Sequence, residues 1–129
     1  MADRGHGGVL VVDDDDLLRE ALCEMLTNHG FRVVGEAGSG QEAVRLASEL
    51  GPDVLIMDFR MAGMDGVEAI DRIRAANPSI QAIMFSAYDD QALSMDAARV
   101  GASSFIVKGS DPMLILEALR RIRGGRAAS

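Results

Sequence analysis

The segment VLVVDDDDLLREALCEMLTNHG, residues 9–30, contains the pattern that decides the fold. It opens with an apolar, β-branched run of the length expected for a buried strand. Four aspartates follow, and apolar residues then recur at offsets of three and four: Leu18, Ala21, Leu22, Met25 and Leu26. We therefore predict a strand over 9–12 and an amphipathic helix after it, with Asp15 as the helix N-cap.

The same unit of strand and helix recurs along the rest of the chain. Further apolar runs predict strands at 31–34, 54–57, 80–85 and 105–107. Helical spacing predicts helices through 43–50, 67–73, 93–100 and 115–122, with these capping and turn signals at their ends: Ser39 with Glu42, Asp65 with Glu68, Gly51-Pro52, Asn77-Pro78 and Asp111-Pro112. Because the strands are apolar on both faces, we predict an α/β fold, a single flavodoxin-like (βα)5 doubly wound parallel sheet with strand order 2-1-3-4-5.

Length and composition indicate one domain. The chain has 129 residues, of which 48% are hydrophobic and 26% charged. We expect the domain to span 9–124, between a flexible N-terminus at 1–8 and a flexible tail at 125–129. The sequence has no run of about 18 uncharged apolar residues, and 1–8 contain no hydrophobic signal segment. These features predict a cytoplasmic protein with no membrane association.

Charge and cysteine content disfavour other classes. The formal net charge is −7 and the pI is near 4.7, so a nucleic acid would be repelled. Near the C-terminus, a group of arginines is better interpreted as a solvated helix end than as a nucleic-acid patch: Arg120, Arg121, Arg123 and Arg126. Cys23 is the only cysteine and lies among apolar residues, so we interpret it as a packing thiol and disfavour redox or zinc chemistry.

The residues directly after the apolar runs supply the predicted chemistry. Asp13, Asp14, Asp15 and Asp16 follow the first strand, Asp58 the third, Ser86 the fourth and Lys108 the fifth. In a doubly wound sheet the ligand site lies beyond the carboxyl ends of strands one and three. Aspartates that meet there repel one another unless a hard divalent cation bridges them, and Mg²⁺ suits a site that handles phosphate. The set predicts a carboxylate nucleophile, with a hydroxyl and an ammonium to stabilise a transferred phosphoryl group.

Each of these residues also has a purely structural interpretation. Asp15 and Asp16 fit a helix cap and its first turn, and we assign them no chemical role. A serine after a strand commonly closes a turn, and a lone lysine is commonly a solvated charge. Lys108, however, is the only lysine among thirteen basic residues. The functional interpretation depends on the acids, the serine and the lysine occurring together.

Four segments carry this set: VVDD at 11–14, MDFRMAGMDG at 57–66, FSA at 85–87 and GASSFIVK at 101–108. They resemble the response-regulator receiver domains of bacterial two-component signalling, of the chemotaxis-regulator kind, and the resemblance covers nearly the whole chain. It implies a role for each site residue: Asp58 is the phosphoacceptor, Asp13 and Asp14 are metal-site acids, the Arg60 carbonyl is a metal ligand, Ser86 and Lys108 contact the phosphoryl group, and Phe105 is the switch aromatic.

Three positions depart from the family pattern. Ala62 stands where proline is usual, which is expected to loosen the loop without removing a chemical group. Gly109 replaces the proline that frequently follows the lysine, so a cis peptide there is not expected. Phe105 lacks the hydroxyl of tyrosine, so switching is expected to depend on burial of the ring.

The resemblance implies a signalling switch. It accepts a phosphoryl group on Asp58 from a sensor histidine kinase or phosphotransfer protein, with Mg²⁺, or Mn²⁺ in its place. The signal passes through the surface of helix four, strand five and helix five to an effector domain or protein, and a phosphorylation-dependent dimer is a further expected state. The chain is not expected to be an enzyme beyond assisting its own phosphorylation and dephosphorylation.

Alternatives remain open from the sequence. One is a receiver-like interaction scaffold that acts without phosphorylation. A hydrolase with the same carboxylates lacks a segment for a substrate cap, and a flavin-binding module would need a phosphate-binding loop where the chain has aspartates. The sequence also leaves open whether the receiver stands alone or precedes an effector such as a helix-turn-helix domain.

Two finer predictions concern the rim of the site. We predict that Mg²⁺ binds through Asp14, Asp58 and the Arg60 carbonyl, with Asp13 acting mainly through water. In the family, the residues that flank the phosphoryl group correspond to Arg60 and Tyr88, and both are large. We predict that they hinder the approach of the attacking water and slow dephosphorylation, unless both side chains simply point into solvent.

Overall fold

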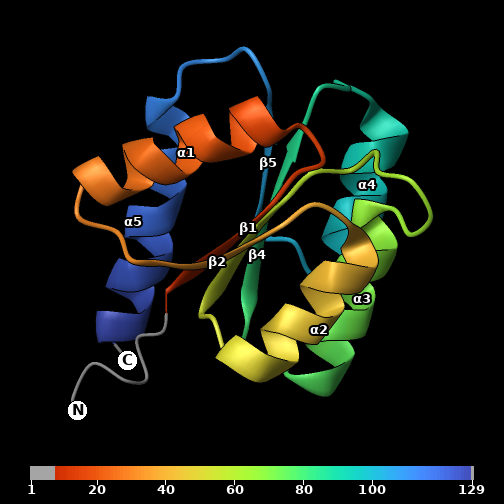
Figure 1. The fold of residues 1–129 in the computed structure, drawn as a ribbon, viewed down its shortest axis with the longest axis horizontal. Helices are drawn as coiled ribbons and strands as arrows, with labels where there is room; N and C mark the ends of the chain where they lie inside the picture. The colour runs from red at the N-terminus through yellow and green to blue at the C-terminus, as the bar shows by residue number, and fades with distance from the viewer. Residues whose placement is uncertain (1–7, 129) are drawn as a thin grey trace.

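Five parallel strands form a sheet in the order β2-β1-β3-β4-β5 in the computed structural model, which describes residues 8–128. Strand and helix alternate along the chain (Figure 1). The elements are β1 Val9–Val12, α1 Asp16–Asn28, β2 Val33–Ala37, α2 Gly40–Leu50, β3 Val54–Met57, α3 Gly66–Ala76, β4 Gln81–Ser86, α4 Gln91–Arg99, β5 Ser104–Val107 and α5 Met113–Ala128. The predicted fold class and strand order are confirmed.

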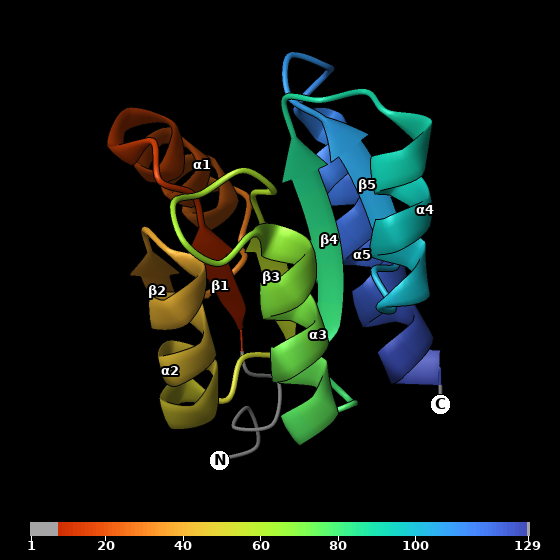
Figure 2. The same ribbon diagram turned by 90° about the vertical axis from the view of Figure 1, so that its right-hand side faces the viewer.

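Helices cover both faces of the sheet. Helices α1 and α5 lie on one face, and α2, α3 and α4 lie on the other (Figures 1 and 2). Side chains of β1 alternate between the two layers: Val9 and Val11 belong to the core with α1 and α5, whereas Leu10 and Val12 belong to the core with α2, α3 and α4. Every residue of β1 and β3 is buried, so the carboxyl ends of these central strands are held by packing on both faces.

The predicted N-caps begin the first three helices. Each accepts a hydrogen bond from a backbone amide of the first helical turn: Asp15 from Leu18 at 3.1 Å, Ser39 from Glu42 at 3.1 Å and Asp65 from Glu68 at 2.9 Å. Two of these caps, Asp15 and Asp65, lie in the loops that follow β1 and β3. The capping bonds therefore help to fix the backbone beside the predicted site.

Strand β2 differs from the prediction at both ends. It was expected at 31–34 and occupies Val33–Ala37. The amide of Phe31 donates to the Leu26 carbonyl at 2.9 Å, which ties this residue to the end of α1 instead of the sheet. The strand then continues because its later residues pair with β1 after a shift of register. Strand β4 is shifted by one residue at both ends of its predicted range, and β5 begins one residue earlier than predicted.

Helix α5 continues beyond the predicted domain boundary at residue 124. It reaches Ala128, so the expected tail begins inside the helix. The glycines at 124 and 125 each cost a helix only about 1 kcal/mol relative to alanine, and no proline interrupts the segment. The predicted flexible residues 1–7 and 129 lie outside the described residues. Neither α5 nor any other helix within 8–128 is long and apolar enough to cross a membrane.

Candidate functional site

The predicted site residues lie at one edge of the sheet. The loops after β1, β3, β4 and β5 gather at the upper edge in Figure 2. Hydrogen bonds of the sheet extend to the site residues themselves: the amide of Asp13 donates to Ala37 at 3.0 Å, that of Asp58 to Val12 at 2.9 Å and that of Lys108 to Ser86 at 2.7 Å. The backbone of each residue is therefore positioned by the sheet, as expected for the carboxyl ends of a doubly wound fold.

Three carboxylates form an acidic cluster, which we define as Asp13, Asp14 and Asp58. One oxygen atom from each carboxylate lies within 4.8 Å of those of the others. Asp13 and Asp58 are only 2% and 6% exposed, whereas Asp14 is exposed. Two buried acids beside an exposed one concentrate negative charge next to solvent, from which an ion can approach.

Lys108 reaches the two buried acids of the cluster. Its Nζ lies 2.7 Å from Asp13 Oδ2 and 3.1 Å from Asp58 Oδ1. The ammonium also lies 5.7 Å from the centre of the Phe85 ring. With all groups ionised, one ammonium faces three carboxylates, so the cluster keeps a charge of about −2, which a divalent cation would balance. The donor set is all oxygen, so the residues present fit Mg²⁺.

The surroundings shift the ionisation of this network. Burial and, after it, the negative charge of Asp13 raise the pKa of Asp58 to about 6, although the contact with Lys108 opposes both effects. For Lys108, burial acts to lower the pKa, but hydrogen bonds to Asp13 and Asp58 outweigh it and the pKa is raised. The lysine is thus held charged beside an acid whose ionised form is costly.

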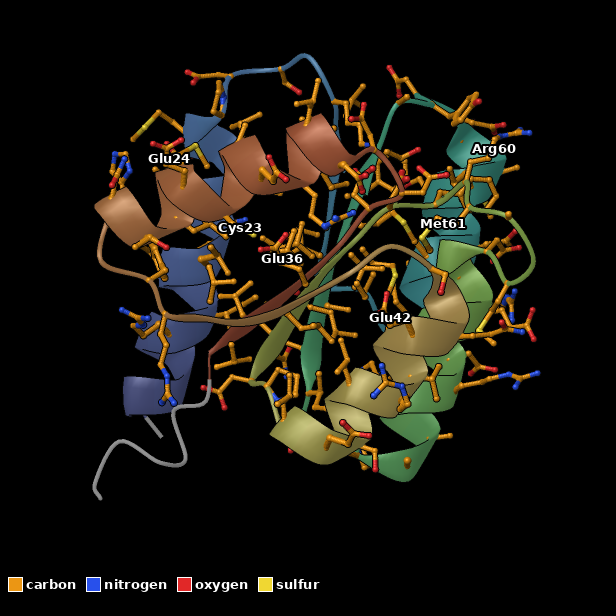
Figure 3. The ribbon with its side chains drawn as sticks, viewed as in Figure 1. Cys23, Glu24, Glu36, Glu42, Arg60 and Met61 are labelled. Atoms are coloured by element: carbon orange, nitrogen blue, oxygen red, sulfur yellow. The ribbon has the colours of Figure 1, made fainter. Side chains whose placement is uncertain are left out.

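The loop after β3 is held closed at its base. The amide of Gly66 donates to the Phe59 carbonyl at 2.8 Å, and a Cβ at position 66 would overlap the Asp58 carbonyl oxygen. Gly63 in the same loop has a φ of 81°. Within this loop Arg60 lies at the outer edge while Met61 is buried and lies inward (Figure 3). The Arg60 carbonyl as a metal ligand stays a prediction.

Arg60 and Tyr88 meet at the mouth of the site. The Arg60 guanidinium carbon lies 4.7 Å from the centre of the Tyr88 ring. Phe59 contacts the same ring edge to face, with 6.5 Å between the ring centres. Tyr88 is 43% exposed, and Arg60 is exposed as well. The two predicted flanking residues therefore contact each other, and their effect on the attacking water stays a prediction.

Ser86 and Phe105 are placed differently from the acids. Ser86 is fully buried, and its Oγ accepts a hydrogen bond from the Tyr88 amide at 3.0 Å. The Phe105 ring is partly buried against the core with α2, α3 and α4, and the residue also lines a groove of about 440 Å³ between β5 and α5. Gly109 after the lysine has a φ of 93°, which proline cannot adopt. This backbone conformation explains why glycine, and not proline, follows the lysine.

Two contacts were missed in the sequence. Arg19 in the first turns of α1 donates to the Asp13 carbonyl, and Lys108 contacts Asp13 as well as Asp58. An arginine on a helix gives no sequence signal for a carbonyl partner.

Cys23 is partly buried against the core with α1 and α5. Burial together with the nearby Glu36 raises its pKa to about 11, which suits a packing thiol.

The sheet order and the cluster of acids and lysine define the class of receiver-like signalling domains. The model of the response regulator receiver domain family matches residues 9–120, and the chain belongs to this family. The chemotaxis protein CheY of Thermotoga maritima is 40% identical over 114 residues, which cover 88% of this chain and 95% of that protein. The response regulator GacA of Pseudomonas aeruginosa is 34% identical over 92% of this chain and 56% of GacA.

A solved structure agrees with the sequence relatives. The CheX-CheY-BeF3-Mg+2 complex from Borrelia burgdorferi contains a chain with a TM-score of 0.84 and 30% identity, over 88% of this chain and 87% of that one. Receiver domains are signalling domains and not classical enzymes, and they bind Mg²⁺ at an aspartate cluster. Asp13, Asp14 and Asp58 form such a cluster in this chain.

Proposed function

We propose that this receiver domain is a phosphorylation-dependent switch with Asp58 as its phosphoacceptor. The observation that carries the proposal is the position of Asp58 in the cluster, with Asp13 and Asp14 nearby and Lys108 in contact. In the transfer, an Asp58 carboxylate oxygen attacks the phosphorus of a phosphohistidine on a sensor kinase or phosphotransfer protein. The phosphorus–nitrogen bond breaks, and its electron pair stays on the imidazole, which takes up a proton.

Mg²⁺ is the proposed cofactor, and Mn²⁺ a substitute for it. Asp14, Asp58 and the Arg60 carbonyl would hold the ion, with Asp13 acting mainly through water. The bound ion supplies neutralisation of charge on the phosphoryl oxygens. The charge of the cluster and its oxygen donors support this assignment.

Lys108 and Ser86 are the proposed contacts of the phosphoryl group. Lys108 Nζ contacts Asp58 Oδ1, so its ammonium would lie close to a phosphoryl group bound to this carboxylate. The Ser86 hydroxyl lies at the end of the neighbouring strand β4 and would donate to a phosphoryl oxygen. Ser86 is fully buried and Lys108 is held by its contacts with Asp13 and Asp58, which favours preorganised stabilisation of charge.

The proposed output surface consists of α4, β5 and α5. Phosphorylation draws Ser86 and Lys108 toward the new charge, and Phe105 on β5 repacks in response. Phe105 is only partly buried against the core, and this incomplete burial supports a side chain that can repack. The expected partners are a histidine kinase, a downstream effector domain or protein, and a second phosphorylated copy of the chain.

Labelling with a kinase tests the assignment directly. Incubation with a cognate histidine kinase and labelled ATP should transfer label to the wild type and not to Asp58→Asn. Asp65→Asn is the matched control, because this acid caps α3 at the end of the same loop, outside the cluster. Undiminished labelling of Asp58→Asn refutes the phosphoacceptor. Absence of label in the wild type, with partner binding retained, favours a scaffold that acts without phosphorylation.

A further inference from the structure

Arg19 makes three polar contacts beside the acidic cluster. Its Nη1 donates to the Asp13 backbone carbonyl at 2.7 Å, its Nε to Glu36 Oε1 at 3.1 Å, and its Nη2 lies 2.9 Å from Asp16 Oδ1. The side chain is only 15% exposed. A guanidinium offers several donors in one rigid plane, so one group can hold three acceptors at once. The three acceptors come from the loop after β1, from β2 and from the first turn of α1.

The contact with the carbonyl concerns the orientation of two acids. The Asp13 carbonyl belongs to the peptide plane that joins Asp13 to Asp14, and this plane turns as one rigid unit. The other polar groups of Asp13 already have partners: the amide bonds to β2, Oδ1 accepts from the Asp15 amide at 2.9 Å and Oδ2 contacts Lys108 at 2.7 Å. Arg19 completes this set, so rotation of the plane, and with it the direction of the Asp14 side chain, is restricted.

Glu36 anchors the guanidinium from the other side. It lies on β2, where it pairs in register with Val11 of β1, and in Figure 3 it lies between that strand and α1. β2 is an edge strand, and besides its pairing with β1 and the bond from the Asp13 amide to Ala37, this ion pair ties it to α1. The pair is partly shielded, with Glu36 43% exposed and Arg19 15% exposed. Arg19 therefore fixes the loop against both the sheet and the helix.

We infer that Arg19 is a positioning residue that sets the affinity of the acidic cluster for Mg²⁺, by fixing the Asp13–Asp14 peptide plane. The inference rests on the proposed metal site and extends it to a residue that contacts no ligand itself. Partners that orient metal ligands in this way commonly change affinity strongly when they are removed.

Because Arg19 is positively charged, loss of its charge and loss of its positioning role should change Mg²⁺ affinity in opposite directions. A positive charge near the cluster repels Mg²⁺, so removal of the charge alone would tighten binding. Loss of positioning has the opposite sign and weakens binding. A purely structural role would lower the melting temperature and leave the dissociation constant unchanged. The sign of the change in Mg²⁺ affinity therefore separates the three explanations.

Titration calorimetry with Mg²⁺ on the wild type, Arg19→Ala and Arg19→Lys tests the inference. We expect both variants to bind Mg²⁺ about tenfold more weakly than the wild type, because lysine keeps the charge but its single nitrogen cannot span the acceptors that Nε, Nη1 and Nη2 of Arg19 hold. Arg72→Ala is the matched control, since Arg72 forms an exposed ion pair with Glu68 on α3. The Mg²⁺ affinity of this variant should equal that of the wild type. Amide exchange of the metal-free protein should be faster at Asp13 and Asp15 in both Arg19 variants.

The outcomes separate failure of this inference from failure of the proposed site. Wild-type protein that binds no Mg²⁺ refutes the metal site and the inference with it. Wild-type binding with equal or tighter binding by the Arg19 variants refutes the inference alone. If Arg19→Ala does not fold, Arg19→Lys decides by the same two measurements, because unchanged affinity and unchanged exchange at Asp13 and Asp15 would show that Arg19 positions nothing.

Discussion

Replacement of Asp58 by asparagine should stabilise the metal-free protein at neutral and alkaline pH. Asparagine has almost the same shape as aspartate but carries no charge. In the wild type, the Asp58 carboxylate is buried beside Asp13, and its pKa is raised to about 6. The variant removes this repulsion, while its amide oxygen can still accept from Lys108 and the ion pair between Lys108 and Asp13 remains.

The size and sign of the effect follow from the shift in pKa. An aspartate has an ordinary pKa of 3.8, so the folded protein disfavours the ionised Asp58 by about two pKa units, or about 3 kcal/mol. Because the folded pKa is the higher one, protonation stabilises the fold: the contribution is complete at a pH below 3.8 and is lost as the pH rises through 6. After allowance for relaxation around the charge, we expect Asp58→Asn to gain about 1–3 kcal/mol at pH 8.

Urea unfolding in the presence of a chelator measures the gain. The difference in free energy of unfolding between Asp58→Asn and the wild type should be largest at pH 8 and should lose most of its size at pH 4.5, where folded wild-type Asp58 is largely protonated. Asp65→Asn, an exposed helix cap, should show no such loss with pH. A variant that is less stable than the wild type at pH 8, or a gain of equal size at both pH values, would refute the reasoning.

Three further predictions concern the metal, the switch and the lifetime. Mg²⁺ should raise the free energy of unfolding of the wild type by about 1.4 kcal/mol per tenfold increase in concentration above its dissociation constant, seen as a rising melting temperature, and an identical response of Asp14→Ala would contradict the metal site. Beryllofluoride should change amide exchange across 89–107, and changes confined to the vicinity of Asp58 would exclude the proposed coupling. With the kinase removed, Arg60→Asn combined with Tyr88→Glu should dephosphorylate faster than the wild type, by about tenfold if the stacked pair blocks the water, whereas equal rates would show that these positions do not set the lifetime.

Sequence patterns predicted the central strands and the positions of the acids well. Strands β1 and β3 have the predicted bounds, because four buried apolar residues followed by aspartate leave little choice of where the strand ends. The edge strand β2 was misplaced, since Phe31 bonds to the end of α1 and the strand contains Gly35 and Glu36, which resemble a loop in sequence.

Contacts of long side chains were not predictable in the same way. The ends of strands place Asp58 and Lys108 near each other, but they do not show that the ammonium also contacts Asp13. The three partners of Arg19 come from separate elements, so they depend on how α1 lies against β2. Such contacts follow from tertiary packing, for which helical spacing and strand length carry no information.

The closed base of the loop after β3 bears on how its sequence can vary. The Gly66 amide bonds to the Phe59 carbonyl, and Gly66 approaches the Asp58 carbonyl closely. These contacts join the two ends of the loop to each other. The middle of the loop can then tolerate Ala62 where a proline is usual. The contacts of Gly66 with Asp58 and Phe59, and not a stiff residue in the middle, set the distance between β3 and α3. A β-carbon at 66 would instead push the Asp58 backbone and the start of α3 apart.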